Sequence, residues 1–263
     1  MAQATRLALV TGASTGIGFE LAGQFVKHGY DVVVCADEPS IHDAAQELSS
    51  TGRVVTPVEA DLRTGDGVAA LYQTATAGGW YLDAAAINAG IGRAGRFVDG
   101  DLQEDLAIVD LNVRSTVHLA KLVLADMVDR GSGRVLFTSS TVAAMPGSYQ
   151  SIYNASKSFV QSFAEALHDE LRDTGVTVTA LMPGPVDTEF FTRAKMRNTL
   201  VGGLLPKDDP ADVARQGYEA MMRGDQKVVA ASLMSKALGA ANMVLPDAVK
   251  ARLNRLIARP MDR

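Results

Sequence analysis

The fold is decided by a glycine-rich stretch near the start of the chain, Thr11-Gly12-Ala13-Ser14-Thr15-Gly16-Ile17-Gly18. It follows the apolar run Leu7–Val10 and opens a segment of helical periodicity through Gly18–His28. Glycine permits backbone angles that other residues avoid and leaves no Cβ between chain and ligand. The start of a helix presents unpaired N–H groups and a partial positive charge, which suits a pyrophosphate. The stretch therefore indicates a dinucleotide-binding turn, with an ordinary glycine-rich turn as the alternative.

Short apolar runs alternate with helical periodicity along the rest of the chain. Further strands are predicted at Val32–Val34, Val54–Val58, Ala84–Ile87, Val135–Phe137, Val176–Leu181 and Lys227–Ala230. Helices are predicted between them at Ile41–Ser49, Val68–Ala77, Gln103–Asp129 and Ile152–Asp173. Wholly apolar strands in βαβα alternation imply a parallel sheet covered by helices on both faces. We therefore expect a single-domain α/β fold with a doubly wound, Rossmann-type parallel sheet.

The tail departs from this alternation. Leu233–Val244 and Pro246–Ile257 are predicted as two amphipathic helices. We expect residues 1–230 to form the dinucleotide-binding and catalytic domain and residues 231–263 to be a C-terminal helical extension of it.

Composition excludes several classes of function. The chain has 263 residues, is 47% hydrophobic and 21% charged, and carries a net charge of −5, so nothing favours a nucleic acid as partner. Its single cysteine, Cys35, excludes an intramolecular disulfide, and its four scattered histidines do not suggest a metal site. No apolar run approaches the ~20 residues that span a bilayer. Gly12 ends the first apolar run too early for a secretory signal, so we expect a cytoplasmic protein.

A second motif, Tyr153-Asn-Ala-Ser-Lys157, begins a predicted helix. Residues four apart share a helix face, so the phenol and the ammonium can point into one cleft. Lowering a tyrosine pKa from about 10 to about 7 requires roughly 4 kcal/mol. A cation about 4 Å away supplies that much at an effective dielectric constant of ~20. By itself the pair could equally be a surface Tyr and Lys on an amphipathic helix.

Two polar residues have places that fit the same cleft. Ser140 follows the strand Val135–Phe137, and ligands of open parallel sheets bind at the carboxyl ends of the strands. Asn112 lies inside a predicted apolar helix, where asparagine is a mediocre helix former. An ordinary satisfied or solvated asparagine is the alternative there.

Together these motifs resemble the short-chain dehydrogenase/reductase family. Ser140, Tyr153, Lys157 and Asn112 match the positions of its catalytic tetrad. Asn88-Ala-Gly90 resembles its NNAG strand end, and Pro183-Gly184-Pro-Val186-Asp-Thr188 resembles its PGxVxT loop on the nicotinamide side. The resemblance covers Leu7 to about Thr188 and again Pro210–Ala214. The residues expected to bind the cofactor are Gly12, Ser14, Thr15, Gly16, Ile17, Gly18, Asp37, Asp61, Leu62, Asn88, Ala89, Gly90, Tyr153, Lys157, Pro183, Gly184, Val186 and Thr188.

The resemblance implies hydride transfer between NAD(P)(H) and a small carbonyl or secondary alcohol, without a metal, in a homodimer or homotetramer. Tyr153 would exchange a proton with the substrate oxygen, Lys157 would lower its pKa, and Ser140 would polarise the oxygen. Asn112 would hold a water that links Lys157 to solvent. The chain departs from the family at Ile87, which replaces the first Asn of NNAG, and in its tail, which lacks the usual glycine-rich ending.

The choice of nicotinamide depends on Asp37, which follows the second strand. A carboxylate there normally bonds the adenosine ribose and repels a 2′-phosphate. By position, however, Asp37 falls one residue after the family's usual NAD-selecting Asp, where NADP users often place Arg, and Ala36 stands in the usual place. No nearby base is evident, and Ala13–Thr15 holds no Lys or Arg. We therefore expect NAD rather than NADP.

Two other functions stay open. The chain could be a cofactor-binding regulator or scaffold that has lost turnover, although a complete tetrad disfavours this. It could also catalyse epimerisation or enoyl reduction, although enoyl reductases usually space Tyr and Lys further apart. Glu189–Leu205 is expected to be a lid over the cleft, and its apolar content suggests a hydrophobic substrate.

Overall fold

The apolar runs of the sequence form one parallel sheet. The computed structural model describes residues 6–50, 52–204, 206–230 and 246–259. Within these, seven strands pair in the order β3-β2-β1-β4-β5-β6-β7, every pair parallel. The strands are β1 (Arg6–Thr11), β2 (Tyr30–Ala36), β3 (Val55–Glu59), β4 (Ala84–Ile87), β5 (Gly133–Thr138), β6 (Val176–Pro183) and β7 (Lys227–Ala230).

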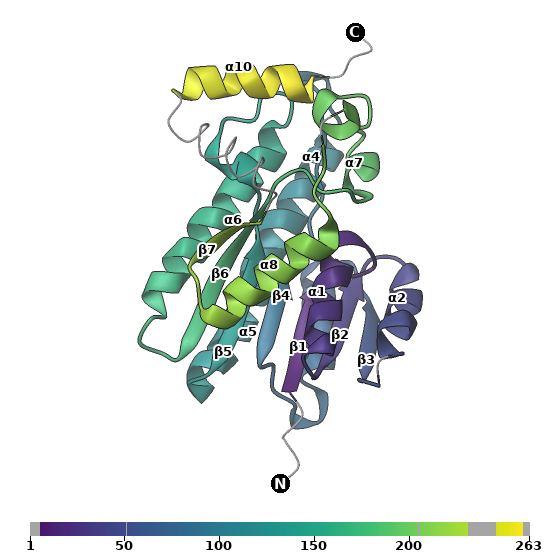
Figure 1. The fold of residues 1–263 in the computed structure, drawn as a ribbon, viewed down its shortest axis with the longest axis vertical. Helices are drawn as coiled ribbons and strands as arrows, with labels where there is room; N and C mark the ends of the chain where they lie inside the picture. Colours follow the sequence, from purple (N-terminus) through teal and green to yellow (C-terminus); the bar gives the residue numbers. More distant parts are fainter. Residues whose placement is uncertain (1–5, 51, 205, 231–245, 260–263) are drawn as a thin grey trace.

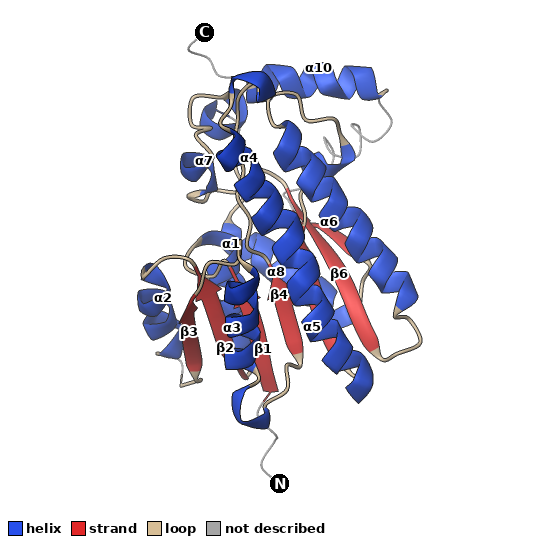
Figure 2. Ribbon diagram, turned by 180° about the vertical axis from the view of Figure 1, so that it is seen from behind, coloured by secondary structure: helices blue, strands red, loops and turns tan. Residues whose placement is uncertain are grey.

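Helices cover both faces of this sheet, which is why its central strands are apolar at nearly every position. One face carries α1 (Gly16–Lys27), α2 (Ser40–Ser49) and α8 (Pro210–Arg223) (Figure 1). The other carries α3 (Gly65–Ala75), α5 (Ser115–Arg130) and α6 (Ser151–Glu170) (Figure 2). Phe25 and Ile41 are fully buried in the first layer, and Leu71 and Leu119 in the second. The predicted Rossmann-type, doubly wound sheet is confirmed.

The order of the strands places a crevice at one end of the sheet. The chain runs outward from β1 to β2 and β3 and then returns to β4 on the other side of β1. At such a switch point the two connections separate, and ligands bind beyond the carboxyl ends of the strands. The elements at this end include α4 (Leu102–Val109), α7 (Phe190–Arg193), the π-helical turn η5 (Leu200–Leu204) and α10 (Asp247–Ala258) (Figure 1).

The helix predicted at Gln103–Asp129 is confirmed, with one irregularity. It runs without a break through α4, a π-helical turn η3 (Asp110–Arg114) and α5. Two hydroxyls bond backbone carbonyls at the turn: Ser115 Oγ donates to Leu111 O at 2.5 Å, and Thr116 Oγ1 donates to Asn112 O at 2.9 Å. Such wide turns are common at functional sites, and this one contains Asn112.

Short 3₁₀ helices occur at η1 (Ala77–Gly79), η2 (Phe97–Asp99) and η4 (Thr141–Ala144). The helix predicted at Pro246–Ile257 is present as α10, whereas the one predicted at Leu233–Val244 lies outside the described residues. No described helix is long and apolar enough to cross a membrane. The described residues also hold no group of three or more His, Cys, Asp or Glu side chains placed to bind a metal.

Candidate active site

A cavity of about 920 Å³ opens at the carboxyl ends of the strands. This is the size of a typical ligand site. Its lining runs from the glycine-rich turn at one end to the segment around Tyr153 at the other. Every residue that the sequence predicted for the cofactor or for catalysis lines this cavity, with the exception of Asn112.

The glycine-rich turn has the shape that a phosphate cradle requires. Gly12 and Gly16 adopt φ of 66° and 60°, which favours glycine. A Cβ on Gly12 would lie 2.9 Å from Ala89 Cα, and one on Gly18 would collide with the Gly12 carbonyl oxygen. The side chain of the α1 N-cap residue, Thr15, makes no capping hydrogen bond, so it leaves the first helical N–H groups unblocked. This end of the cavity fits a pyrophosphate.

Asn88 joins three strand ends beneath the cavity. Its Nδ2 donates to Thr11 O at 3.1 Å, and its Oδ1 accepts from Thr138 Oγ1 at 3.0 Å. Thr11 Oγ1 in turn accepts from the backbone N–H of Asn88 at 2.9 Å. Ile87, where the related family has its first Asn, is buried in the core. The network therefore forms around Asn88 without a polar side chain at position 87.

The end of β5 positions Lys157. Lys157 Nζ donates to Thr138 O at 2.8 Å, and Ser139 Oγ donates to Lys157 O at 2.8 Å. Burial lowers the pKa of Lys157 to about 8, because desolvation disfavours the ammonium. This strand end thus holds both the backbone and the amine of Lys157.

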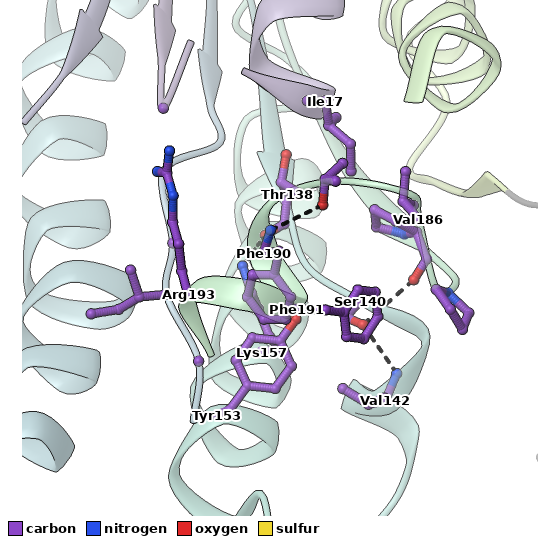
Figure 3. A pocket seen from close by; sticks show the side chains of 18 of the residues that line it. Ile17, Thr138, Ser140, Val142, Tyr153, Lys157, Val186, Phe190, Phe191 and Arg193 are labelled. Carbon is purple, nitrogen blue, oxygen red and sulfur yellow. Dashed lines mark hydrogen bonds between the residues drawn. The ribbon is translucent and has the colours of Figure 1, made fainter. Parts of the chain in front are cut away.

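Ser140 and Tyr153 form a hydroxyl pair in the same cavity. The Ser140 hydroxyl hydrogen-bonds the phenol of Tyr153, and its Oγ lies 3.4 Å from Pro183 O. Figure 3 shows Tyr153, Lys157 and Ser140 gathered around the side chains of Phe190 and Phe191. The serine and the tyrosine present a donor and acceptor pair to any oxygen placed between them.

The expected lowering of the Tyr153 pKa by Lys157 is not found in this conformation. Burial raises the pKa of Tyr153 to about 12, and the hydrogen bond from Ser140 offsets this only in part. Lys157 Nζ lies 5.9 Å from the centroid of the Tyr153 ring and is engaged by Thr138. Sequence spacing placed both groups on one helix face, but it could not show that desolvation outweighs their attraction.

Asn112 lies behind the cavity wall rather than in it. Its Oδ1 accepts from the Ile91 N–H at 2.9 Å, and its Nδ2 donates to Ile91 O and to Ser156 Oγ, both at 2.9 Å. The side chain is therefore satisfied by protein groups. These bonds hold the loop after β4 against the helix that carries Tyr153.

Two arginines lie at the end of β2, which corrects the expectation that no base is near Asp37. Arg63 Nη2 is 3.9 Å from Asp37 Oδ2, and Arg63 also bonds Asp61 at 2.8 Å. Arg193 Nη2 donates to Glu38 Oε1 at 2.8 Å. In Figure 3 the Arg193 side chain extends away from Tyr153. No local signal reveals this contact, because 155 residues separate its partners.

The order of the motifs and this geometry agree with the match of the family model for short chain dehydrogenases over residues 6–198. The chain belongs to the short-chain dehydrogenase family. The family consists of oxidoreductases that depend on NAD(P), and this chain has its fold.

Curated relatives of this short-chain dehydrogenase include oxidoreductases from bacteria. Oxidoreductase UcpA of Escherichia coli strain K12 is 32% identical over 221 residues, which cover 83% of this chain and 81% of UcpA. Probable oxidoreductase EphD of Mycobacterium tuberculosis strain H37Rv is 33% identical over 186 residues, 70% of this chain but 31% of EphD.

Solved structures of the family superpose on nearly the whole chain. A short-chain dehydrogenase from Sphingobium yanoikuyae in complex with NADPH has a TM-score of 0.80 at 27% identity, covering 98% of this chain and 99% of its own. A 3-ketoacyl-(acyl-carrier-protein) reductase from Brucella melitensis complexed with NADH has a TM-score of 0.77 at 25% identity, covering 88% of this chain and 98% of its own. Both nicotinamide cofactors thus occur among similar structures.

The cavity of this short-chain dehydrogenase also includes residues that the sequence motifs did not reveal. Phe190, in the predicted lid, packs 5.2 Å from the Tyr153 ring, and a Cβ on Gly92 would lie 2.7 Å from Phe190 Cζ. The apolar character of 190–204 was the available signal for this contact. The lining residues of α10 had no such signal; they are Leu253, Asn254, Leu256 and Ile257.

Proposed function

We propose that this short-chain dehydrogenase transfers a hydride between NAD(P)(H) and the carbon of a ketone or secondary alcohol. The observation that carries the proposal is the convergence of Ser140, Tyr153 and Lys157 in one cavity with the glycine-rich cradle. An epimerase or a retired scaffold has no specific observation in its favour.

Each residue of the site has a separate role in the proposed reaction. The glycine-rich turn and the strand ends would hold a nicotinamide cofactor, which would supply or accept the hydride when bound. Ser140 Oγ hydrogen-bonds the substrate oxygen, and Tyr153 Oη gives that oxygen a proton in reduction or takes one in oxidation. Lys157 Nζ, now 5.9 Å from the centroid of the Tyr153 ring, would favour the phenolate when its positive charge approaches the phenol in the reacting complex. Asn112 holds the Ile91 backbone and Ser156 and so positions the helix that presents Tyr153.

For the cofactor we propose NAD(H) over NADP(H). Three carboxylates, those of Asp37, Glu38 and Asp61, meet two guanidinium groups, those of Arg63 and Arg193, at the end of β2. Each arginine is already paired with a carboxylate, so a 2′-phosphate would enter a region with one excess negative charge. Repulsion by a phosphate charge near −2 at about 5 Å is on the order of 2 kcal/mol even in a wet site.

The direct test is absorbance of the reduced nicotinamide with a panel of ketones and secondary alcohols and with both cofactors. Turnover that depends on Tyr153 supports the proposal. If the cofactor binds but no ketone or alcohol is turned over, the proposal is wrong and the chain is a cofactor-binding scaffold without turnover.

A further inference from the structure

Helix α10 is anchored on the connection between β5 and α6, which joins Ser140 to the helix of Tyr153. Figure 1 shows it lying across the carboxyl end of the sheet. Asn254 Nδ2 donates to Ser148 O at 2.8 Å, and Lys250 Nζ donates to Ala144 O at 3.4 Å. Ala144 ends the 3₁₀ turn that follows Ser140, and Ser148 comes shortly before the helix that carries Tyr153. The position of α10 is therefore tied to the catalytic end of the cavity.

The packing face of α10 is not its apolar face. Its buried stripe is Lys250, Asn254 and Ala258, spaced four residues apart. A helix that only covers a core buries its apolar residues. Here Leu253 and Leu256 are 44% and 65% exposed, although both line the cavity. Lys250 and Asn254 attach the helix to the β5–α6 connection. Leu253 and Leu256, beside them, line the cavity.

Most of the α10 residues that line the cavity are apolar, namely Leu253, Leu256 and Ile257. The same cavity is also lined by the side chains of Met145, Phe190, Phe191, Met196 and Val201. The one polar α10 residue in the lining is Asn254, whose Nδ2 is bonded to Ser148 O and whose Oδ1 is a buried acceptor without a partner among the described residues. The charged residues of α10, among them Lys250 and Arg252, are not among those that line the cavity, so a charged substrate body would lose hydration here without gaining an ion pair from α10.

We propose that α10 forms a wall of the substrate site and that Leu253, Leu256 and Ile257 bind the uncharged apolar body of the substrate. The substrate class is then a ketone or secondary alcohol with an aliphatic or aromatic substituent of several carbons. This inference rests on the proposed function for the reacting group, whereas the apolar subsite itself can be measured by binding alone.

The test is a titration of methyl ketones, from butanone to octanone, into the full chain with oxidised cofactor. No hydride can move under these conditions, so calorimetry reports binding only. Burial of a methylene tightens binding about fourfold, so affinity should rise by about that factor per added carbon. In the double variant Leu253→Ala/Ile257→Ala, the gain should fall below about twofold per carbon, with butanone binding unchanged.

Val249→Ala is the matched control. Val249 is an apolar residue of the same helix that is 39% exposed and does not line the cavity, so its loss should leave the chain-length dependence unchanged. Melting curves of each variant check the fold. If the double variant unfolds, Leu256→Glu decides, because Leu256 is 65% exposed and can accept a charge. Octanone should then bind at least about tenfold more weakly, at the usual cost of desolvating a charge.

Any one of the following results would overturn the subsite. One is wild-type affinity that does not change with chain length. Another is the same dependence in wild type and in the folded double variant, and the last is unchanged octanone binding in Leu256→Glu. Failure of the proposed function looks different: chain-length dependence persists in binding, but no ketone is turned over with reduced cofactor.

Discussion

The side chain of Asn112 brackets the backbone of Ile91, accepting from its N–H and donating to its carbonyl, each at 2.9 Å. The second hydrogen on Nδ2 goes to Ser156, on the helix of Tyr153. One buried amide thus joins the π-helical turn, the loop after β4 and α6. A residue expected to hold a water instead uses its hydrogen-bonding groups to position backbone.

Asn112→Asp should therefore destabilise the fold. The change keeps the shape of the side chain but replaces two donated bonds with an acceptor that faces the Ile91 carbonyl and a Ser156 hydroxyl already donating to Tyr153 O, in a residue only 1% exposed. We expect a loss of about 3 kcal/mol in the free energy of unfolding, measured with urea. Gln103→Glu, at an exposed position in the first turn of α4, is the control and should cost nothing. Equal stability of Asn112→Asp and wild type would show that the bracket is dispensable.

Tyr153→Phe should remove turnover and leave the site intact. The ring keeps its packing 5.2 Å from Phe190, while the transferable proton is lost. We expect turnover to fall at least ~100-fold, the usual scale for a positioned acid or base, with cofactor affinity little changed. Tyr81→Phe, at a tyrosine 61% exposed, should turn over like wild type. Near-normal rates in Tyr153→Phe would contradict the proposed mechanism.

Cofactor preference tests the charges at the end of β2. Wild type should favour NAD(H) in kcat/KM, and Asp37→Arg should move the preference toward NADP(H) by roughly 30-fold or more, the factor that corresponds to about 2 kcal/mol. Arg63→Ala tests the contribution of the positive charge. It should strengthen the preference for NAD(H) over NADP(H), because it removes a cation 3.9 Å from Asp37. A wild-type preference for NADP(H) would mean that Arg63 and Arg193 outweigh the carboxylates.

Stability should depend on pH through Lys157. Burial lowers its pKa from 10.5 to about 8, so between these values the unfolded chain binds more protons than the folded one. The contribution of Lys157 to stability then rises with pH across this window, while the buried thiol of Cys35, its pKa raised from 9.0 to about 12, acts in the opposite direction above about pH 9. The full contribution of Lys157 is about 3 kcal/mol by the conversion of pKa shifts to free energy. Tyr153, with its pKa raised to about 12, acts in the opposite direction and only above about pH 10.

Lys157→Met removes the lysine contribution. The melting temperature of wild type relative to this variant should increase as the pH is raised from about 8 to about 10. Lys121→Met, at an exposed position of α5, is the control, whose difference from wild type should not follow that course. A constant difference for Lys157→Met would indicate that the pKa of the amine is the same in the folded and the unfolded chain.

Self-association is expected through α5 and α6. Most apolar residues of the two helices pack on the sheet, among them Leu119, Met127 and Val160. Val117 and Phe159 are each 39% exposed, and the Phe159 ring stacks on Phe163 at 5.6 Å. We expect light scattering to give twice the mass of one chain and Phe159→Glu to weaken the dimer. A single-chain mass for wild type at micromolar concentration would reject it.

Local patterns were sufficient wherever the chemistry is local. Apolar runs predicted the parallel strands, and the glycine spacing predicted a cradle whose backbone requires glycine at positions 12 and 16. The same patterns predicted the helix around η3 but did not reveal the π-helical turn in it, because such a turn has nearly the same sequence periodicity as the helix on either side. They also missed the burial that moves the pKa values of Tyr153 and Lys157 in unfavourable directions.

The sequence by itself determined the fold class, the family and the residues of the cleft, because strand burial, turn geometry and motif order are written within short windows. Only the tertiary structure decided that Arg193 meets Glu38 and that Asn254 meets Ser148, across 155 and 106 residues. Only it showed that the apolar residues of α10 face the cavity rather than the core. Such contacts depend on how whole elements pack, and no local periodicity specifies that.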